Sequence, residues 1–165
     1  MKKPIFCVLA FQLAGVLCLA AAVFGQTPYA ASDLLGTWGF GLSGTVIVKP
    51  ASSAAAGDCA GGAAVSQPVA MDGTLVADGK GGLTGVQTLN IAGTVCSGTL
   101  KGSYSVNPDG TGTLDGVVFT PAADSPAQCT VSVTNSSFTF SNGVNHLDLA
   151  GTDCFQVVSG SATRQ

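Results

Sequence analysis

The fold is decided by a turn that the chain uses twice, in Val76-Ala-Asp-Gly-Lys-Gly-Gly-Leu-Thr-Gly85 and in Val106-Asn-Pro-Asp-Gly-Thr-Gly-Thr-Leu114. Each stretch places an Asp-Gly pair, with another glycine close behind, between runs that alternate apolar and small polar residues. Asp-Gly supplies the positive φ angles of tight hairpins at little steric cost. The two stretches therefore predict antiparallel β-structure on both sides of each turn.

Period-two alternation extends this pattern along the chain. It is clearest from Trp38 to Lys49, where the even positions carry the large side chains. Eight or nine short strands, without helical periodicity beyond the N-terminal segment, predict an all-β fold. We expect a single antiparallel up-and-down β-barrel of about eight strands, because consecutive hairpins need no long crossover and closure removes exposed edges. A β-sandwich is the alternative.

The first 25 residues have the pattern of a secretory signal peptide. Lys2 and Lys3 precede an apolar run, Ile5 to Phe24, and small residues surround the expected cleavage after Gly25. A retained membrane anchor is the alternative, since the run approaches the ~20 residues of a span. Cleavage would leave one β-barrel domain, residues 26–165, with no membrane span and a long loop at 50–68, secreted to the periplasm or the medium.

Four cysteines follow the leader: Cys59, Cys96, Cys129 and Cys154. An even number in an exported chain predicts two disulfides, with three possible pairings. We prefer Cys59–Cys96 with Cys129–Cys154, because each bond then closes a local piece of the sheet. The spacing does not suit a metal site, since no two of these cysteines are two to four residues apart.

Charge is sparse, and it excludes two classes of partner. The chain has 6 basic and 9 acidic residues, a formal net charge of −3, and no basic patch. This argues against nucleic acid and against anionic membrane surfaces as partners. No motif indicates a cofactor, and none is a catalytic signature.

The motifs together resemble a known group of proteins. The order Leu35-Gly-Thr-Trp-Gly-Phe40, the two turn stretches and Val158-Ser-Gly-Ser-Ala-Thr-Arg-Gln165 is similar to secreted bacterial proteins of uncharacterised function. These look like small β-barrels of the calycin or allene-oxide-cyclase type. The resemblance spans nearly all of the mature chain and implies a barrel, export and a bacterial source. It supplies no catalytic residue, and the four cysteines are not part of the shared pattern.

Aromatic residues on the strands are the candidate ligand contacts. Either they fill the interior, since a barrel of about eight strands has little room beyond its side chains, or they line a cavity for a small apolar ligand. The candidates for the second interpretation are Trp38, Phe40, Tyr104, Phe138 and Phe140.

His146 and Asp148 share one strand face and, with a serine such as Ser141 or Ser159, could form a hydrolytic triad. We expect instead an outward, solvated pair and assign no catalytic residue. The predicted function is non-enzymatic binding of a small apolar ligand or of a surface partner. A cyclase- or isomerase-like enzyme for an apolar substrate and a structural cell-surface component remain alternatives. The identity of the ligand and the oligomeric state are open.

Overall fold

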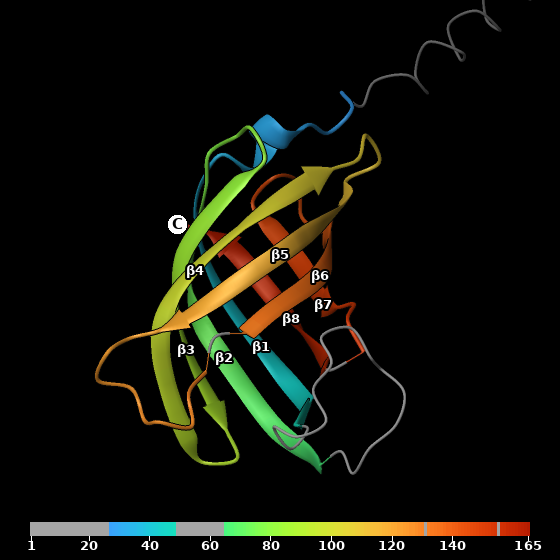
Figure 1. Cartoon of the computed structure of the whole chain (residues 1–165). Coiled ribbons are helices and arrows are strands. Elements are labelled where there is room, and N and C mark those ends of the chain that lie inside the picture. The colour runs from blue at the N-terminus through green and yellow to red at the C-terminus, as the bar shows by residue number, and fades with distance from the viewer. Residues whose placement is uncertain (1–26, 49–64, 131, 155) are drawn as a thin grey trace, which may run out of the picture.

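The computed structural model describes residues 27–48, 65–130, 132–154 and 156–165. Its strands form one closed barrel in which each is antiparallel to its neighbours in sequence order, and β8 returns to pair with β1 (Figure 1). The strands are β1 (Gly36–Val48), β2 (Val65–Ala77), β3 (Gly82–Ile91), β4 (Thr94–Val106), β5 (Thr111–Pro121), β6 (Ser132–Phe140), β7 (His146–Gly151) and β8 (Gln156–Arg164). The predicted eight-stranded up-and-down barrel is confirmed, and the sandwich alternative is wrong.

One short 3-10 helix, η1 (Ala31–Leu34), precedes β1. It was not predicted, because four residues are too few to show a helical period. Within the described ranges, no helix has the length and apolar character that crossing a membrane requires.

The predicted turns have the expected backbone. Gly79 and Gly110 adopt φ angles of 73° and 87°. The carboxylate of Asp78 accepts hydrogen bonds from the backbone N–H groups of Lys80 (2.7 Å) and Gly82 (2.8 Å). These bonds stabilise the ionised form, so they lower the pKa of Asp78.

The Asp109 carboxylate has a similar role in the β4–β5 turn. It accepts from the backbone N–H of Thr111 at 3.0 Å and from the Thr111 hydroxyl at 2.7 Å. Both bonds lower the pKa of Asp109, the hydroxyl contributing most. The acidic residue of each turn therefore fixes the hairpin that its sequence predicts.

The inward-facing side chains follow the predicted alternation, except in β5. There the pairing shifts register between Leu114 and Val117, around Asp115 and Gly116, and the inward set changes parity. Gly116 has a φ of 57° at this bulge. Sequence alternation treats β5 as one uninterrupted run and gives no sign of the change.

β2 begins at Val65, earlier than the sequence indicates, so the end of the expected loop at 50–68 belongs to the sheet. Pro68 is tolerated because its pairing partner on β1 is Thr45, whereas pairing with β3 starts only at Val69. At such a partial edge, a missing N–H removes no bond between strands. The part of the loop at 49–64 lies outside the described residues.

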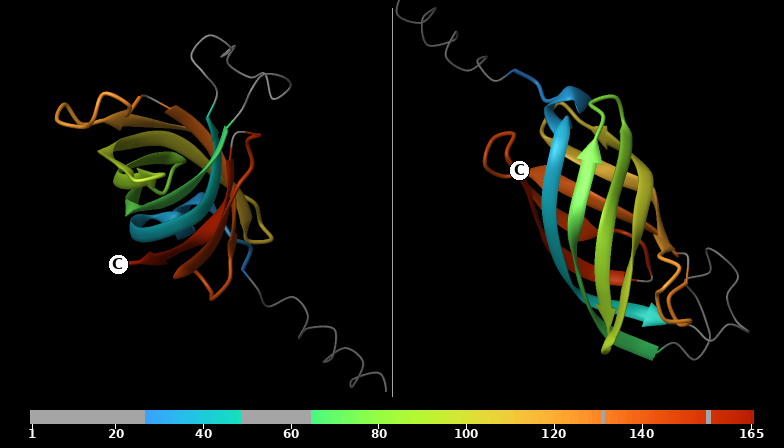
Figure 2. Two further views of the ribbon diagram at one scale, coloured as in Figure 1. Left: turned by 90° about the horizontal axis from the view of Figure 1, so that it is seen from below. Right: turned by 90° about the vertical axis from the view of Figure 1, so that its left-hand side faces the viewer.

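The barrel has two unlike ends (Figures 1 and 2). At one, η1 lies beside the β2–β3 and β4–β5 turns, and we call this the capped end. The other, seen from below in Figure 2, carries the β3–β4 turn at 92–93 and the β5–β6 loop, of which residues 122–130 are described. We call it the disulfide end, because Cys96 and Cys129 are bonded there.

Candidate functional site

The capped end is closed by polar contacts to the backbone of η1. The indole Nε1 of Trp38, 1% exposed, donates to the Leu34 carbonyl at 2.8 Å. The guanidinium of Arg164 lies 4.9 Å from the centre of the Trp38 ring and donates through Nη2 to the Asp33 carbonyl. This stacking and hydrogen bonding join the start of β1, the end of β8 and the cap into one unit.

Tyr104 belongs to the same unit. Its hydroxyl donates to the Ala31 carbonyl at 3.1 Å, and burial is the largest cause of its raised pKa. Tyr29, before η1, stacks on Phe140 with ring centres 4.8 Å apart, and Phe138 meets Phe140 edge-on at 5.9 Å. These aromatic residues pack against one another and against the cap.

The sequence singled out five aromatic residues, and the structure places all of them in the core. Trp38, Tyr104 and Phe140 contact the cap or the segment before it, and Phe138 packs on Phe140. Phe40 lies one inward position further along β1. Their contact with a ligand stays a prediction, and Phe40 is the best placed of the five.

The interior toward the disulfide end is less tightly enclosed. Inward-facing side chains of the capped end are almost completely buried, for example Ala77 (1%) and Leu147 (3%). Toward the disulfide end, several inward-facing side chains keep accessible surface: Leu42, Val46, Met71, Ile91 and Thr134. Since these side chains face inward, the accessible surface faces the barrel's interior or its mouth.

Gln87 is the unusual residue of this region. It occupies an inward position of β3, between Leu83 and Gly85 on one side and Leu89 on the other, and is 9% exposed. Its side-chain amide has no hydrogen-bond partner among the described residues. It is also not among their fully enclosed, unpartnered atoms, of which the Nε of Arg164 is the example. The amide therefore keeps a little accessible surface, and the inward register of Gln87 places its side chain on the interior side of the sheet.

The strands beside Gln87 explain why its amide has no partner. Gln87 pairs with Gly73 on β2 and with Gly98 on β4, so neither neighbour offers a side chain. The Phe40 ring lies 3.0 Å from where a Cβ of Gly73 would be, and the Phe119 ring 2.7 Å from that of Gly98. The rings of Phe40 and Phe119 therefore lie against the two glycines that flank Gln87 in the sheet.

A second inward glutamine, Gln156, shows what a structural amide looks like in this protein. It is 6% exposed, and its Nε2 donates to the Asp153 carboxylate at 2.8 Å and to the Asn135 carbonyl at 3.3 Å. Buried polar groups normally have such partners. Gln87 departs from this rule, which marks it as a candidate binding group.

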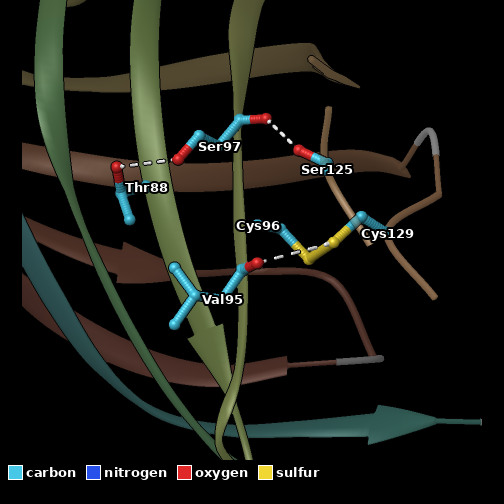
Figure 3. Close-up of a disulfide and its surroundings, with 6 residues drawn as sticks. All are labelled: Thr88, Val95, Cys96, Ser97, Ser125 and Cys129. Carbon is cyan, nitrogen blue, oxygen red and sulfur yellow. Dashed lines mark hydrogen bonds between the residues drawn. A yellow bond between two sulfur atoms is a disulfide. The ribbon is translucent and has the colours of Figure 1, made fainter. Parts of the chain in front are cut away.

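The disulfide pairing that we preferred is wrong. Cys96, on β4, is bonded to Cys129, in the β5–β6 loop (Figure 3). The loop folds back along β4, where the Ser125 hydroxyl donates to the Ser97 carbonyl at 2.9 Å. Nearness in sequence therefore did not indicate which cysteines meet. The bond indicates an oxidising, extracytoplasmic compartment.

Cys154 is also disulfide-bonded. Cys59, the remaining candidate for a bridge, lies outside the described residues. Both preferred pairs are excluded, because each contains Cys96 or Cys129.

The pair His146 and Asp148 faces outward, as predicted. The Nε2 of His146 lies 3.6 Å from the Asp148 carboxylate, and the two side chains are 33% and 62% exposed. The hydroxyl near Nδ1 of His146 is that of Thr163, at 3.2 Å, and not that of Ser141 or Ser159. The group lies on the solvated wall, away from the interior.

The outer wall carries a shallow groove of about 550 Å³ across β2 to β5. Gly73, Gln87 and Gly98 line its floor, and Thr74 and Thr99 stand among the outward side chains beside it. Five of its twelve lining residues carry hydroxyl groups: Thr74, Thr88, Ser97, Thr99 and Thr120. It is the second candidate surface, on the opposite side of the sheet from the Gln87 amide.

Comparison of the chain with protein-family models, with curated proteins and with solved structures finds no match. The candidate site therefore depends on the geometry of this chain. Sequence reasoning missed Gln87, although a signal was present: it is a polar residue in the inward register of Leu83 and Leu89.

Proposed function

We propose that this barrel binds a small, largely apolar molecule in its interior, toward the disulfide end. The observation that carries the proposal is Gln87, an inward residue of β3 that is 9% exposed and whose side-chain amide has no hydrogen-bond partner among the described residues. Ligand sites are mostly apolar, with a few placed polar groups that fix orientation. An amide flanked in the sheet by two glycines, against which the rings of Phe40 and Phe119 lie, fits this composition.

The unequal ends support the same function. Hydrogen bonds to η1 close one end, while inward side chains toward the other end keep accessible surface. Eight-stranded barrels are just wide enough to be filled by side chains or to hold one small ligand, as in lipocalins. The proposed kinship with calycin-type barrels is in keeping with this arrangement.

The protein would act outside the cytoplasm. The N-terminal segment has the pattern of a cleaved leader, and the Cys96–Cys129 bond suits an oxidising compartment. N-terminal sequencing of the protein exported by a bacterial host should give Gln26 as the first residue. A first residue within the leader would contradict export by cleavage.

Binding can be tested with Nile red, an uncharged apolar dye whose emission rises in apolar surroundings. We expect saturable binding of one dye per barrel. Ser136→Phe should abolish it, because Ser136 faces inward and the ring would occupy the interior. Ser137→Phe is the matched control, since the adjacent serine faces outward.

Dye emission that rises without saturation, or equal binding by both serine variants, would contradict an interior site. Recovery of the bound molecule separates a carrier from an enzyme. A carrier releases its ligand unchanged, whereas a cyclase- or isomerase-like enzyme returns a product.

A further inference from the structure

We propose that the barrel selects uncharged ligands, and that Gln87 recognises a hydroxyl or carbonyl group on an otherwise apolar molecule. This inference rests on the proposed binding function and names the chemical class of its ligand. It follows from the polar groups that face the interior and from the absence of charge among the described inward positions of the strands.

Gln87 offers one acceptor and two donor hydrogens, all neutral. A ligand hydroxyl can satisfy both the carbonyl oxygen and the amino group of the side chain, and a ligand ketone, ester or amide can accept from the amino group. Leaving such an amide unpaired costs free energy, so a ligand that pairs with it gains over one that does not. The amide therefore favours a ligand with one polar group at the level of Phe40 and Phe119.

The ionisable groups nearest to the interior are already engaged or lie at its margins. Arg164 faces inward at the capped end, where its guanidinium donates to Asp33 and lies over Trp38. Asp153, in the β7–β8 connection at the disulfide end, accepts from Gln156 and from the backbone N–H of Asn135. Between these two levels, the described inward positions of the strands carry no ionisable side chain.

The described inward polar groups toward the disulfide end are likewise neutral. They are amides and hydroxyls: Gln67, Gln87, Thr94, Thr134 and Ser136. A carboxylate brought into this interior would lose water without gaining a cation, and this loss weakens its binding relative to an uncharged group. The negative charge of Asp153 at the same end opposes its entry further. An ammonium group would also lie unpaired at the level of Gln87.

The test compares 1-decanol with decanoate, which share one chain length and differ in charge. Affinities are measured by displacement of Nile red at about pH 7. We expect decanol to bind at least about tenfold more tightly than decanoate. Gln87→Met keeps the length of the side chain and removes its hydrogen-bonding groups. It should lower the affinity for decanol about tenfold and change the affinity for Nile red by less than about threefold.

Thr88→Val is the matched control, because Thr88 is the next residue on β3 and points outward into the groove. This variant should leave the affinities for decanol and for Nile red unchanged. Gln87→Asn is a second variant that keeps the amide on a shorter stem, and it should retain the preference for decanol over decanoate. Melting curves of the three variants confirm that each barrel is folded.

The outcomes are distinguishable. Saturable Nile red binding with equal or tighter binding of decanoate, or an unchanged decanol affinity in Gln87→Met, would overturn the inference and leave the binding function standing. An effect of Thr88→Val as large as that of Gln87→Met would place the ligand in the outer groove and also overturn it. Failure of Nile red and of decanol to bind would remove the proposed function itself.

Discussion

The capped end and the disulfide end are built from the same alternating strands, yet they finish in different ways. At the capped end, Trp38, Tyr104 and Arg164 direct their polar atoms to carbonyls of η1, and the apolar side chains are almost fully buried. At the other end, a covalent bond holds a loop against β4, and inward side chains stay partly accessible. The contacts of the capped end stabilise the barrel, whereas toward the other end we propose that the unpaired amide of Gln87 binds a ligand.

The largest expected effect is on stability, at the capped end. Trp38→Ala should lower the free energy of unfolding by about 3–5 kcal/mol, because it empties the best packed site and removes a buried hydrogen bond. Met71→Ala, inward but half-buried, should cost about 1–2 kcal/mol. Urea unfolding of both variants measures the difference, and equal losses would show that the two ends do not differ in packing.

Removing the Cys96–Cys129 bond tests the contribution of the disulfide end to stability. Cys129→Ser opens a loop with a sequence separation of 33 residues and should cost about 2–4 kcal/mol. One reactive thiol, that of Cys96, should appear in the folded protein. Trp38 fluorescence of the native state should stay unchanged, because the capped end is held by its own contacts. Unchanged melting together with no new thiol would refute the bond.

Acid should loosen the hairpin turns before it affects the apolar core. Asp78 and Asp109 have lowered pKa values in the folded state, so their contribution to stability is present above their unfolded value of 3.8. That contribution is lost as the pH falls through 3.8 and below the lowered folded values. Stability measured from about pH 6 downward should fall in this window, and less steeply in Asp78→Asn and Asp109→Asn. An identical acid profile in both variants would assign the loss to other groups.

The smallest expected effect concerns the β3–β4 turn at the disulfide end. Ala92 has a φ of 48°, in the left-handed region that alanine disfavours, and Gly93 follows it. Ala92→Asn creates an Asn-Gly turn and should stabilise the protein by about 0.5–1 kcal/mol. Ala123→Asn, exposed in the β5–β6 loop, is the control and should change little. A lower melting temperature for Ala92→Asn would contradict the turn geometry.

The fold could be predicted from the sequence because its signals are local. An Asp-Gly pair fixes the backbone within two residues, and alternation along β1 shows which side chains face inward. Closure into a barrel followed from the succession of hairpins. The bulge at Asp115 and Gly116 escaped prediction, because a register shift depends on pairing with β6 and leaves the alternation of its own strand ambiguous.

The candidate site was harder to predict, because it depends on what stands next to a residue in space. Alternation alone places Gln87 inside, but its lack of a partner requires the register that sets it between Gly73 and Gly98. The Cys96–Cys129 bond likewise depends on the path of a loop. The aromatic residues were chosen as candidate ligand contacts because they are large and lie on the strands. Most of them instead pack at the cap, and its helix η1 is too short to be recognised from the sequence.

The most direct test of the binding account follows side-chain signals by NMR as 1-decanol is added. We expect the side-chain amide signals of Gln87 and the methyl signals of Met71 and Leu89 to shift with saturation, while the indole N–H signal of Trp38 stays in place. Signals that remain fixed at Gln87, or that move instead at Thr74 and Thr99 on the outer wall, would contradict an interior ligand held by this amide.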